Sequence, residues 1–130
     1  MLTRVVRYDN IVSLQMALRT RPVSWLGSAL KEFERFPEGV QLTCLAALTI
    51  AAEGGKADIA RPMDFLGPGV FEIQQPFRGV VYRVVYAAQP GAELWVVCVV
   101  QKKSKPGVKT SSGGANLIRE RLKRLKEMLS

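Results

Sequence analysis

Histidine is absent from the 130 residues of this chain. Its absence excludes the Ser-His-Asp and Cys-His arrangements of nucleophilic catalysis and every metal site that depends on imidazole. Any acid–base chemistry must therefore use Lys, Arg, Tyr, Asp, Glu or Cys. Because Glu53, Asp58 and Asp64 do not form a metal-ligand pattern, no metal and no cofactor is expected.

Cysteines are few, and long apolar runs are missing. Cys44 and Cys98 each lie in an apolar stretch and form no CxxC pair, which predicts buried free thiols in a reducing compartment. The apolar run Cys44–Ala52 is too short to span a bilayer. Met1–Arg21 contains several charges that interrupt any signal peptide. We therefore expect a cytoplasmic protein with no membrane partner.

Acidic residues are scarce at the C-terminal end. From Gln101 to Ser130 there are nine basic residues and only two acids, Glu120 and Glu127, so this segment carries +7 of the net charge of +8. A localised positive field predicts a polyanionic partner, either nucleic acid or an acidic protein surface. The alternative is a solvated face that keeps the protein in solution.

The chain length and a 48% hydrophobic content indicate one core. Residues 1–21 are predicted as an N-terminal extension, either a short strand or partly disordered, and residues 22–130 as the folded domain. Periodicity and turn residues predict these elements: strand Val23–Trp25, helices Ala29–Phe36 and Pro37–Glu53, an irregular loop Lys56–Gly69, strands Val70–Gln75, Val80–Ala88 and Leu94–Val100 with a turn at Pro76–Gly79, and helix Ala115–Leu129. Segregated strands and helices indicate an α+β fold with an antiparallel meander.

Arg83 is unusual because it interrupts the apolar strand Val80–Ala88. A long cation there needs a partner or an edge that sees water. One alternative is an ion pair with Glu72 on the neighbouring strand. The other is a guanidinium that projects from the sheet and binds phosphate oxygens.

The strand Leu94–Val100 is entirely apolar and is followed at once by Gln101-Lys102-Lys103-Ser104-Lys105. This change is either a solvated strand exit or a site held at the end of a rigid element. The meander can bring Arg83 near Lys102 and Lys103, with Arg78 in the preceding turn. Clustered cations would stabilise a phosphorane, and a lysine with a lowered pKa would deprotonate a 2′-hydroxyl. Phe77 is the predicted base-stacking residue, whereas Tyr82, Tyr86 and Trp95 are predicted core residues.

Several motifs in order resemble the phage-related HigB-like branch of the RelE/ParE toxin superfamily over about residues 22–129. They are Trp25-Leu26-Gly27-Ser28, Phe36-Pro37-Glu38, Gly69-Val70-Phe71-Glu72-Ile73, Tyr82-Arg83-Val84-Val85-Tyr86, Gln101-Lys102-Lys103-Ser104 and Ile118-Arg119-Glu120-Arg121-Leu122. The resemblance implies a helical hairpin packed on a small antiparallel sheet with a mixed edge, followed by a C-terminal helix.

The resemblance also implies a function: a type II toxin that cleaves mRNA on the ribosome without a metal, and a paired antitoxin with a helix-turn-helix domain, similar to HigA. Arg83 would stabilise the scissile phosphate, and Lys102 and Lys103 would bind RNA, one of them transferring a proton. The expected RNA-binding residues around them are Arg78, Gln101, Ser104, Lys105, Lys109 and Arg119.

The chain departs from this pattern at two points. Some relatives use a histidine or a C-terminal tyrosine, which this chain lacks, and Asp64 stands where a second lysine is expected. The superfamily also contains ParE-like toxins that inhibit gyrase without cutting RNA, so superfamily membership does not establish catalysis. Two alternatives therefore stay open: a gyrase-inhibiting toxin and a basic nucleic-acid-binding phage-related protein.

Overall fold

The computed structural model describes residues 21–88, 93–102 and 112–129. In chain order its elements are β1 (Val23–Trp25), α2 (Ala29–Phe33), α3 (Glu38–Ala52), β2 (Ala60–Pro62), the 3-10 helix η1 (Asp64–Leu66), β3 (Val70–Phe77), β4 (Val80–Ala87), β5 (Leu94–Lys102) and α4 (Ser112–Leu129). The predicted α+β class is confirmed. Of the predicted extension, residues 1–21, only Arg21 lies within the described residues.

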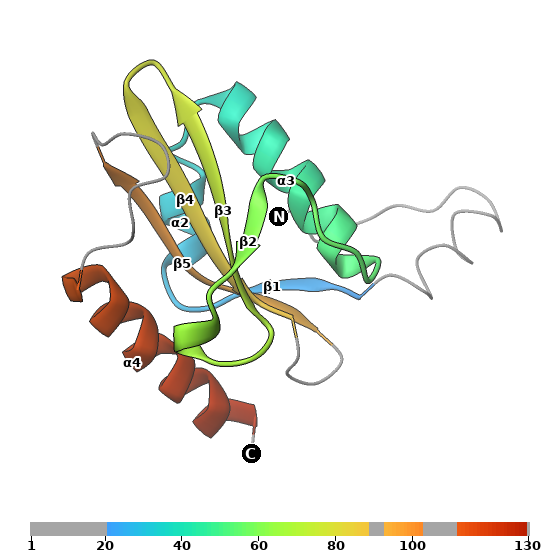
Figure 1. The fold of residues 1–130 in the computed structure, drawn as a ribbon, viewed down its shortest axis with the longest axis vertical. Helices are drawn as coiled ribbons and strands as arrows, with labels where there is room; N and C mark the ends of the chain where they lie inside the picture. Colours follow the sequence, from blue (N-terminus) through green and yellow to red (C-terminus); the bar gives the residue numbers. More distant parts are fainter. Residues whose placement is uncertain (1–20, 89–92, 103–111, 130) are drawn as a thin grey trace, which may run out of the picture.

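The strands form one mixed sheet in the order β1-β5-β4-β3-β2 (Figure 1). β3, β4 and β5 form the predicted antiparallel meander, and β1 adds to its edge in parallel with β5. β5 therefore has a neighbour on each side, which suits a strand with apolar residues on both faces.

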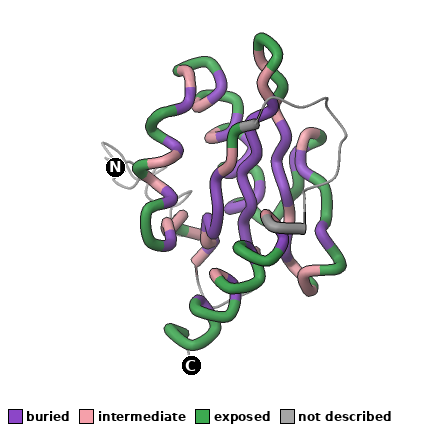
Figure 2. The backbone as a smooth tube through the Cα atoms, turned by 90° about the vertical axis from the view of Figure 1, so that its left-hand side faces the viewer, coloured by how far each residue is buried: buried purple, intermediate pink, exposed green. Residues whose placement is uncertain are grey.

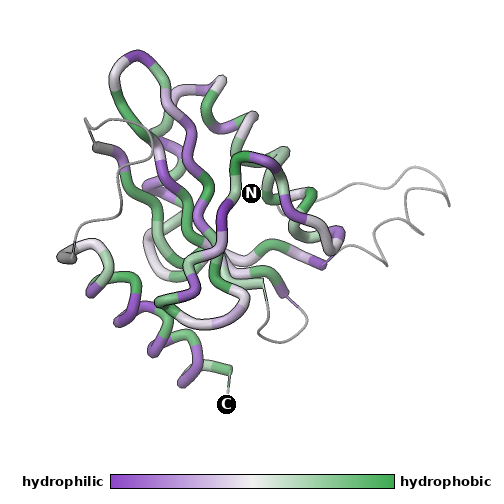
Figure 3. Tube along the Cα trace, in the orientation of Figure 1, coloured by the Kyte–Doolittle hydropathy of each residue, from purple (hydrophilic) through white to green (hydrophobic). Residues whose placement is uncertain are grey.

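Helices cover both faces of this sheet. α2 and α3 pack on one face, where Phe33, Val40 and Leu48 meet Val84 and Tyr86. α4 packs on the other face through the stripe Ile118, Leu122 and Leu125. β4 and the apolar part of β5 are accordingly buried for most of their length, while the outer side of α4 is exposed and largely polar (Figures 2 and 3).

A β-bulge modifies the face that β5 presents to α4. The register between β4 and β5 shifts between Val85 and Tyr86, so that Val85 pairs with Cys98 and Tyr86 pairs with Val96. The inserted residue is Val97, and both Val97 and Cys98 belong to the core under α4. Arg121 Nη1 donates to the Val97 carbonyl at 3.1 Å and so ties α4 to the bulge.

The predicted four-residue turn Pro76–Gly79 is wrong in its extent. Pro76 and Phe77 remain in β3, and the hairpin turns through Arg78 and Gly79 alone, with φ of 51° and 80°. Two successive positive φ angles are typical of a tight hairpin turn. Pro76 is tolerated because β2 pairs only as far as Ile73, so β3 is an edge strand at that point.

The predicted irregular loop Lys56–Gly69 is also wrong, because it contains β2 and η1. The Pro and Gly residues suggested a loop, but Pro62 ends an edge strand whose only neighbour is β3, where a missing N–H costs little. The first helix ends at Phe33 instead of Phe36, and α4 begins at Ser112 instead of Ala115.

Candidate nucleic-acid interface

A buried polar cluster lies on the α4 side of the sheet and consists of Glu72, Gln74 and Arg83. Gln74 and Arg83 are directly paired across β3 and β4, and Glu72 lies two residues further along β3. Side chains two residues apart on a strand share a face. The three residues are only 3%, 7% and 4% exposed, although the rest of the buried residues are hydrophobic. This is therefore the one place in the described core where the sheet is not apolar.

Glu72 is the hub of the cluster. Its Oε1 accepts a hydrogen bond from Gln74 Nε2 at 2.9 Å and lies 3.3 Å from Arg83 Nη1. The ion-pair alternative for Arg83 is thus confirmed. Because a buried guanidinium without compensation is costly, this contact holds the positive charge in the sheet at a fixed position.

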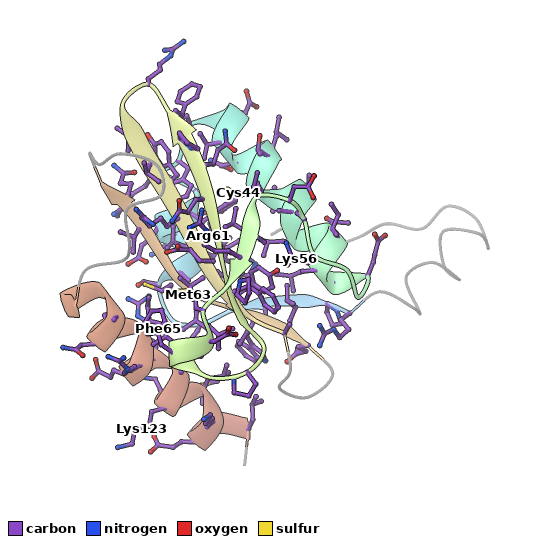
Figure 4. The ribbon with its side chains drawn as sticks, viewed as in Figure 1. Cys44, Lys56, Arg61, Met63, Phe65 and Lys123 are labelled. Atoms are coloured by element: carbon purple, nitrogen blue, oxygen red, sulfur yellow. The ribbon has the colours of Figure 1, made fainter. Side chains whose placement is uncertain are left out.

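Arg61 is a neighbouring cation that the sequence did not single out. It lies on β2 directly opposite Glu72, so the two side chains share the α4 face of the sheet. Arg61 is exposed, in contrast to Arg83, and Figure 4 shows it on the outermost strand. Its position was hidden because Pro62 favoured a loop. No alternation marks this short strand in the sequence, because Arg61 and Pro62 are both exposed.

The basic end of β5 is described only in part. Gln101 is exposed and pairs with Tyr82, a residue of the core under α2 and α3, so it lies on the face opposite Arg83. The backbone of Lys102 pairs with Val81, two residues from Arg83 along β4. The expected contributions of Lys103, Ser104, Lys105 and Lys109 fall outside the described residues.

Two other predicted RNA-binding residues lie away from the buried cluster. Arg78 occupies the tip of the β3–β4 hairpin, with its guanidinium 5.0 Å from the centre of the Phe77 ring. Arg119 is exposed on α4, with its guanidinium 5.8 Å from the centre of the Phe65 ring. The structure therefore does not bring Arg78, Arg83 and Arg119 into a single site.

The aromatic residues differ in exposure. Tyr82 and Tyr86 are buried in the core, as predicted. The predicted position of Phe77 in a turn is wrong, because it ends β3 and packs against the core, and its base-stacking role stays a prediction. Phe65 on η1 is 60% exposed. The sequence did not single it out, because Pro62, Gly67 and Pro68 around it predict an irregular loop.

The buried thiols do not offer a reactive nucleophile. Burial raises the pKa of Cys44 to about 12 and also raises that of Cys98, and both thiols are free. A thiolate would be the reactive form, so both groups are inert near neutral pH. Among the described residues, no group of three or more His, Cys, Asp or Glu side chains is placed to hold a metal ion. No helix in the described ranges is long and apolar enough to cross a bilayer.

Taken together, the geometry defines a small basic α+β protein with a buried ion pair in its sheet and exposed cations around it. The family model of the phage-derived Gp49-like proteins (DUF891) matches residues 31–123, which includes α3, the sheet from β2 to β5, and most of α4. The chain belongs to this family. Searches of curated proteins and of solved structures gave no significant match.

Proposed function

We propose that this protein is the toxin of a type II toxin–antitoxin system and that it cleaves mRNA on the ribosome. The Gp49-like family is commonly associated with RelE-like toxins. The observation that carries the proposal is two arginines on one face of the sheet, Arg83 buried against Glu72 and Arg61 exposed on β2 opposite Glu72. Such a pair fits two successive tasks on an RNA backbone, binding and charge stabilisation.

The chemistry needs no metal or cofactor. The 2′-hydroxyl loses a proton and attacks the adjacent phosphorus, and the 5′-oxygen leaves with a proton. The products are a 2′,3′-cyclic phosphate and a 5′-hydroxyl. Fixed cations stabilise the additional negative charge on the phosphorane oxygens. Arg83 supplies this charge from a fixed position, and Arg61 holds a neighbouring phosphate.

The exposure of the two arginines sets an order of contacts. Arg61 reaches solvent in the free protein, so it binds RNA without rearrangement. Arg83 is 4% exposed, so direct contact with a phosphate requires the groups that cover it to move. The ribosome would hold the mRNA in the orientation needed for cleavage, because this site has few exposed groups that could orient it. Lys102 and Lys103 are proposed to bind RNA, and one of them to transfer a proton.

Substitution of the two arginines tests this proposal. Purified protein is added to translating ribosomes, and new mRNA 5′ ends are mapped for wild type, Arg61→Ala and Arg83→Ala. Arg35→Ala is the matched control, because Arg35 is an exposed arginine between α2 and α3, the helices of the opposite sheet face. We expect new ends with wild type and with Arg35→Ala, and fewer with the other two variants. Absence of new ends with wild type would refute the proposal.

One observation favours a second candidate function. Arg83 is 4% exposed and paired with Glu72, so it does not reach an RNA phosphate in this structure, which fits a toxin that inhibits gyrase without cutting RNA. Cells that express such a toxin would show a DNA-damage response before translation stops. Cells that express a ribosome-dependent nuclease would stop translating first. In both cases we propose an antitoxin encoded by a neighbouring gene.

A further inference from the structure

A groove runs between η1 and α4, and its lining does not include the residues of the buried ion pair. Its volume is about 260 Å³, and its lining consists of Phe65, Leu66, Arg119, Leu122, Lys123 and Lys126. The lining thus combines an aromatic ring and two leucines with three cations and no acid. Figure 4 shows Phe65 and Lys123 on the two elements that form it.

The floor and the rim of the groove have different properties. Leu122 is 8% exposed and belongs to the core under α4, and Leu66 packs against the same core. The floor is therefore fixed by the folded domain. Phe65 is 60% exposed at the rim, and Arg119, Lys123 and Lys126 are exposed as well.

Phe65 is held by its surroundings on one side. Its backbone is part of η1, and the guanidinium of Arg119 lies over the ring. A cation over one face of an aromatic ring stabilises the ring in place. A second flat group can then stack on the ring without the entropy cost of ordering a mobile side chain.

The cations are spaced along one side of α4. Residues 119, 123 and 126 are four and three apart, so they project from neighbouring turns of the helix. They span about 10 Å along its axis, a length that accommodates about two or three consecutive phosphates. The acids of α4, Glu120 and Glu127, are not part of the groove lining.

We infer that this groove binds a single-stranded RNA segment, with one base stacked on Phe65 and the adjacent phosphates on Arg119, Lys123 and Lys126. A flat aromatic beside a row of cations matches the two parts of a nucleotide, and stacking works for any base. The inference rests on the proposed function for the choice of RNA as the polyanion. It extends that function, because η1 directly follows β2, which carries Arg61. The RNA would run from the arginine pair on the sheet to the groove.

The direct test is RNA affinity in the absence of ribosomes. The probe is a fluorescent single-stranded RNA of about ten nucleotides, and its anisotropy is measured with the full chain. Phe65→Ala should weaken binding at least about fivefold, the effect of losing one stacked base. Phe65→Trp should bind as tightly as wild type or more tightly. Leu42→Ala is the matched control, since Leu42 is 64% exposed on α3, and should bind as wild type does.

The salt dependence tests the cations separately. Lys123→Ala combined with Lys126→Ala should reduce the slope of log affinity against log salt by about 1.4, the value for two phosphate contacts on a single strand. Arg124→Ala, an exposed cation of the same helix outside the groove, is the control. It should leave the affinity within about twofold of wild type, because its contribution is only to the general field.

The possible outcomes separate RNA binding by the groove from cleavage of mRNA. If Phe65→Ala and the double lysine variant bind RNA as their controls do, the groove assignment is overturned, whether or not wild type cuts mRNA on ribosomes. If these variants lose RNA affinity while wild type produces no new mRNA ends, the groove stands and the proposed nuclease activity fails. If they keep RNA affinity but lose binding to the purified product of the neighbouring gene, the groove is a protein-docking surface and the inference is refuted.

Discussion

The buried Glu72–Arg83 pair allows a quantitative prediction about stability. Glu72→Gln removes the negative charge but keeps the shape and an oxygen that can accept the hydrogen bond from Gln74 Nε2. Because the side chains of the pair are 4% and 5% exposed, solvent cannot screen the remaining charge on Arg83. Breaking a buried pair by removal of one partner costs about 3–5 kcal/mol. We expect Glu72→Gln to lower the free energy of unfolding by about 3 kcal/mol.

Urea denaturation and thermal melting measure this change. For a domain of this size, a loss of 3 kcal/mol corresponds to a decrease in Tm of about 10 °C. Glu34→Gln, which neutralises an exposed carboxylate, should change the unfolding free energy by less than about 0.5 kcal/mol. A double-mutant cycle with Arg83→Met separates the pair from the packing. The two single variants together should lower the free energy of unfolding by at least about 2 kcal/mol more than the double variant does. If Glu72→Gln were as stable as Glu34→Gln, the ion pair would not hold the sheet together as described.

Three further predictions concern other residues. Burial raises the pKa of Cys44 from 9.0 in the unfolded chain to about 12, so the contribution of this thiol to stability is complete below pH 9 and is lost as pH rises toward 12. Urea titrations should show the free energy of unfolding declining by up to about 1.4 kcal/mol per pH unit in this range, and the decline should be smaller in Cys44→Ala. Arg121→Met should lower the free energy of unfolding by about 1–2 kcal/mol and increase amide hydrogen exchange in α4, because it removes the hydrogen bond to the Val97 carbonyl. Arg124→Met, at an exposed position of the same helix, should change neither. Arg61→Ala should reduce mRNA cleavage without changing Tm by more than about 2 °C, because its side chain is exposed.

The sequence predicted the central part of the fold well, because strong periodic patterns produced it. The unbroken apolar run before Gln101 predicted the strand β5, which has a neighbour on each side, and alternation in β4 placed Val81, Arg83 and Val85 on one face and Tyr82, Val84 and Tyr86 on the other. Neither pattern contains the bulge at Val97, because an inserted residue leaves the composition of the strand unchanged.

The edges of the sheet and the candidate site were predicted less completely. Pro62 and Pro76 predict breaks in strands, although each lies where a missing N–H has no partner to lose. The loop predicted around Pro62 leaves Arg61 and Phe65 without a sequence signal. For Arg83 the sequence left two alternatives, since only the three-dimensional register shows that the Glu72 carboxylate is within reach. The RNA-binding roles of Arg78, Arg119 and the lysines after β5 stay predictions.

Mapping the chemistry of mRNA ends tests the central claim most directly. Wild-type protein is incubated with ribosomes that are translating a defined mRNA, and the 5′ ends of the fragments are examined for a hydroxyl or a phosphate. We expect new ends that carry a 5′-hydroxyl, that appear only when ribosomes are present, and that decrease with Arg83→Ala and Arg61→Ala but not with Arg35→Ala. Intact mRNA, or cleavage that is insensitive to both arginine substitutions on the sheet, would contradict it.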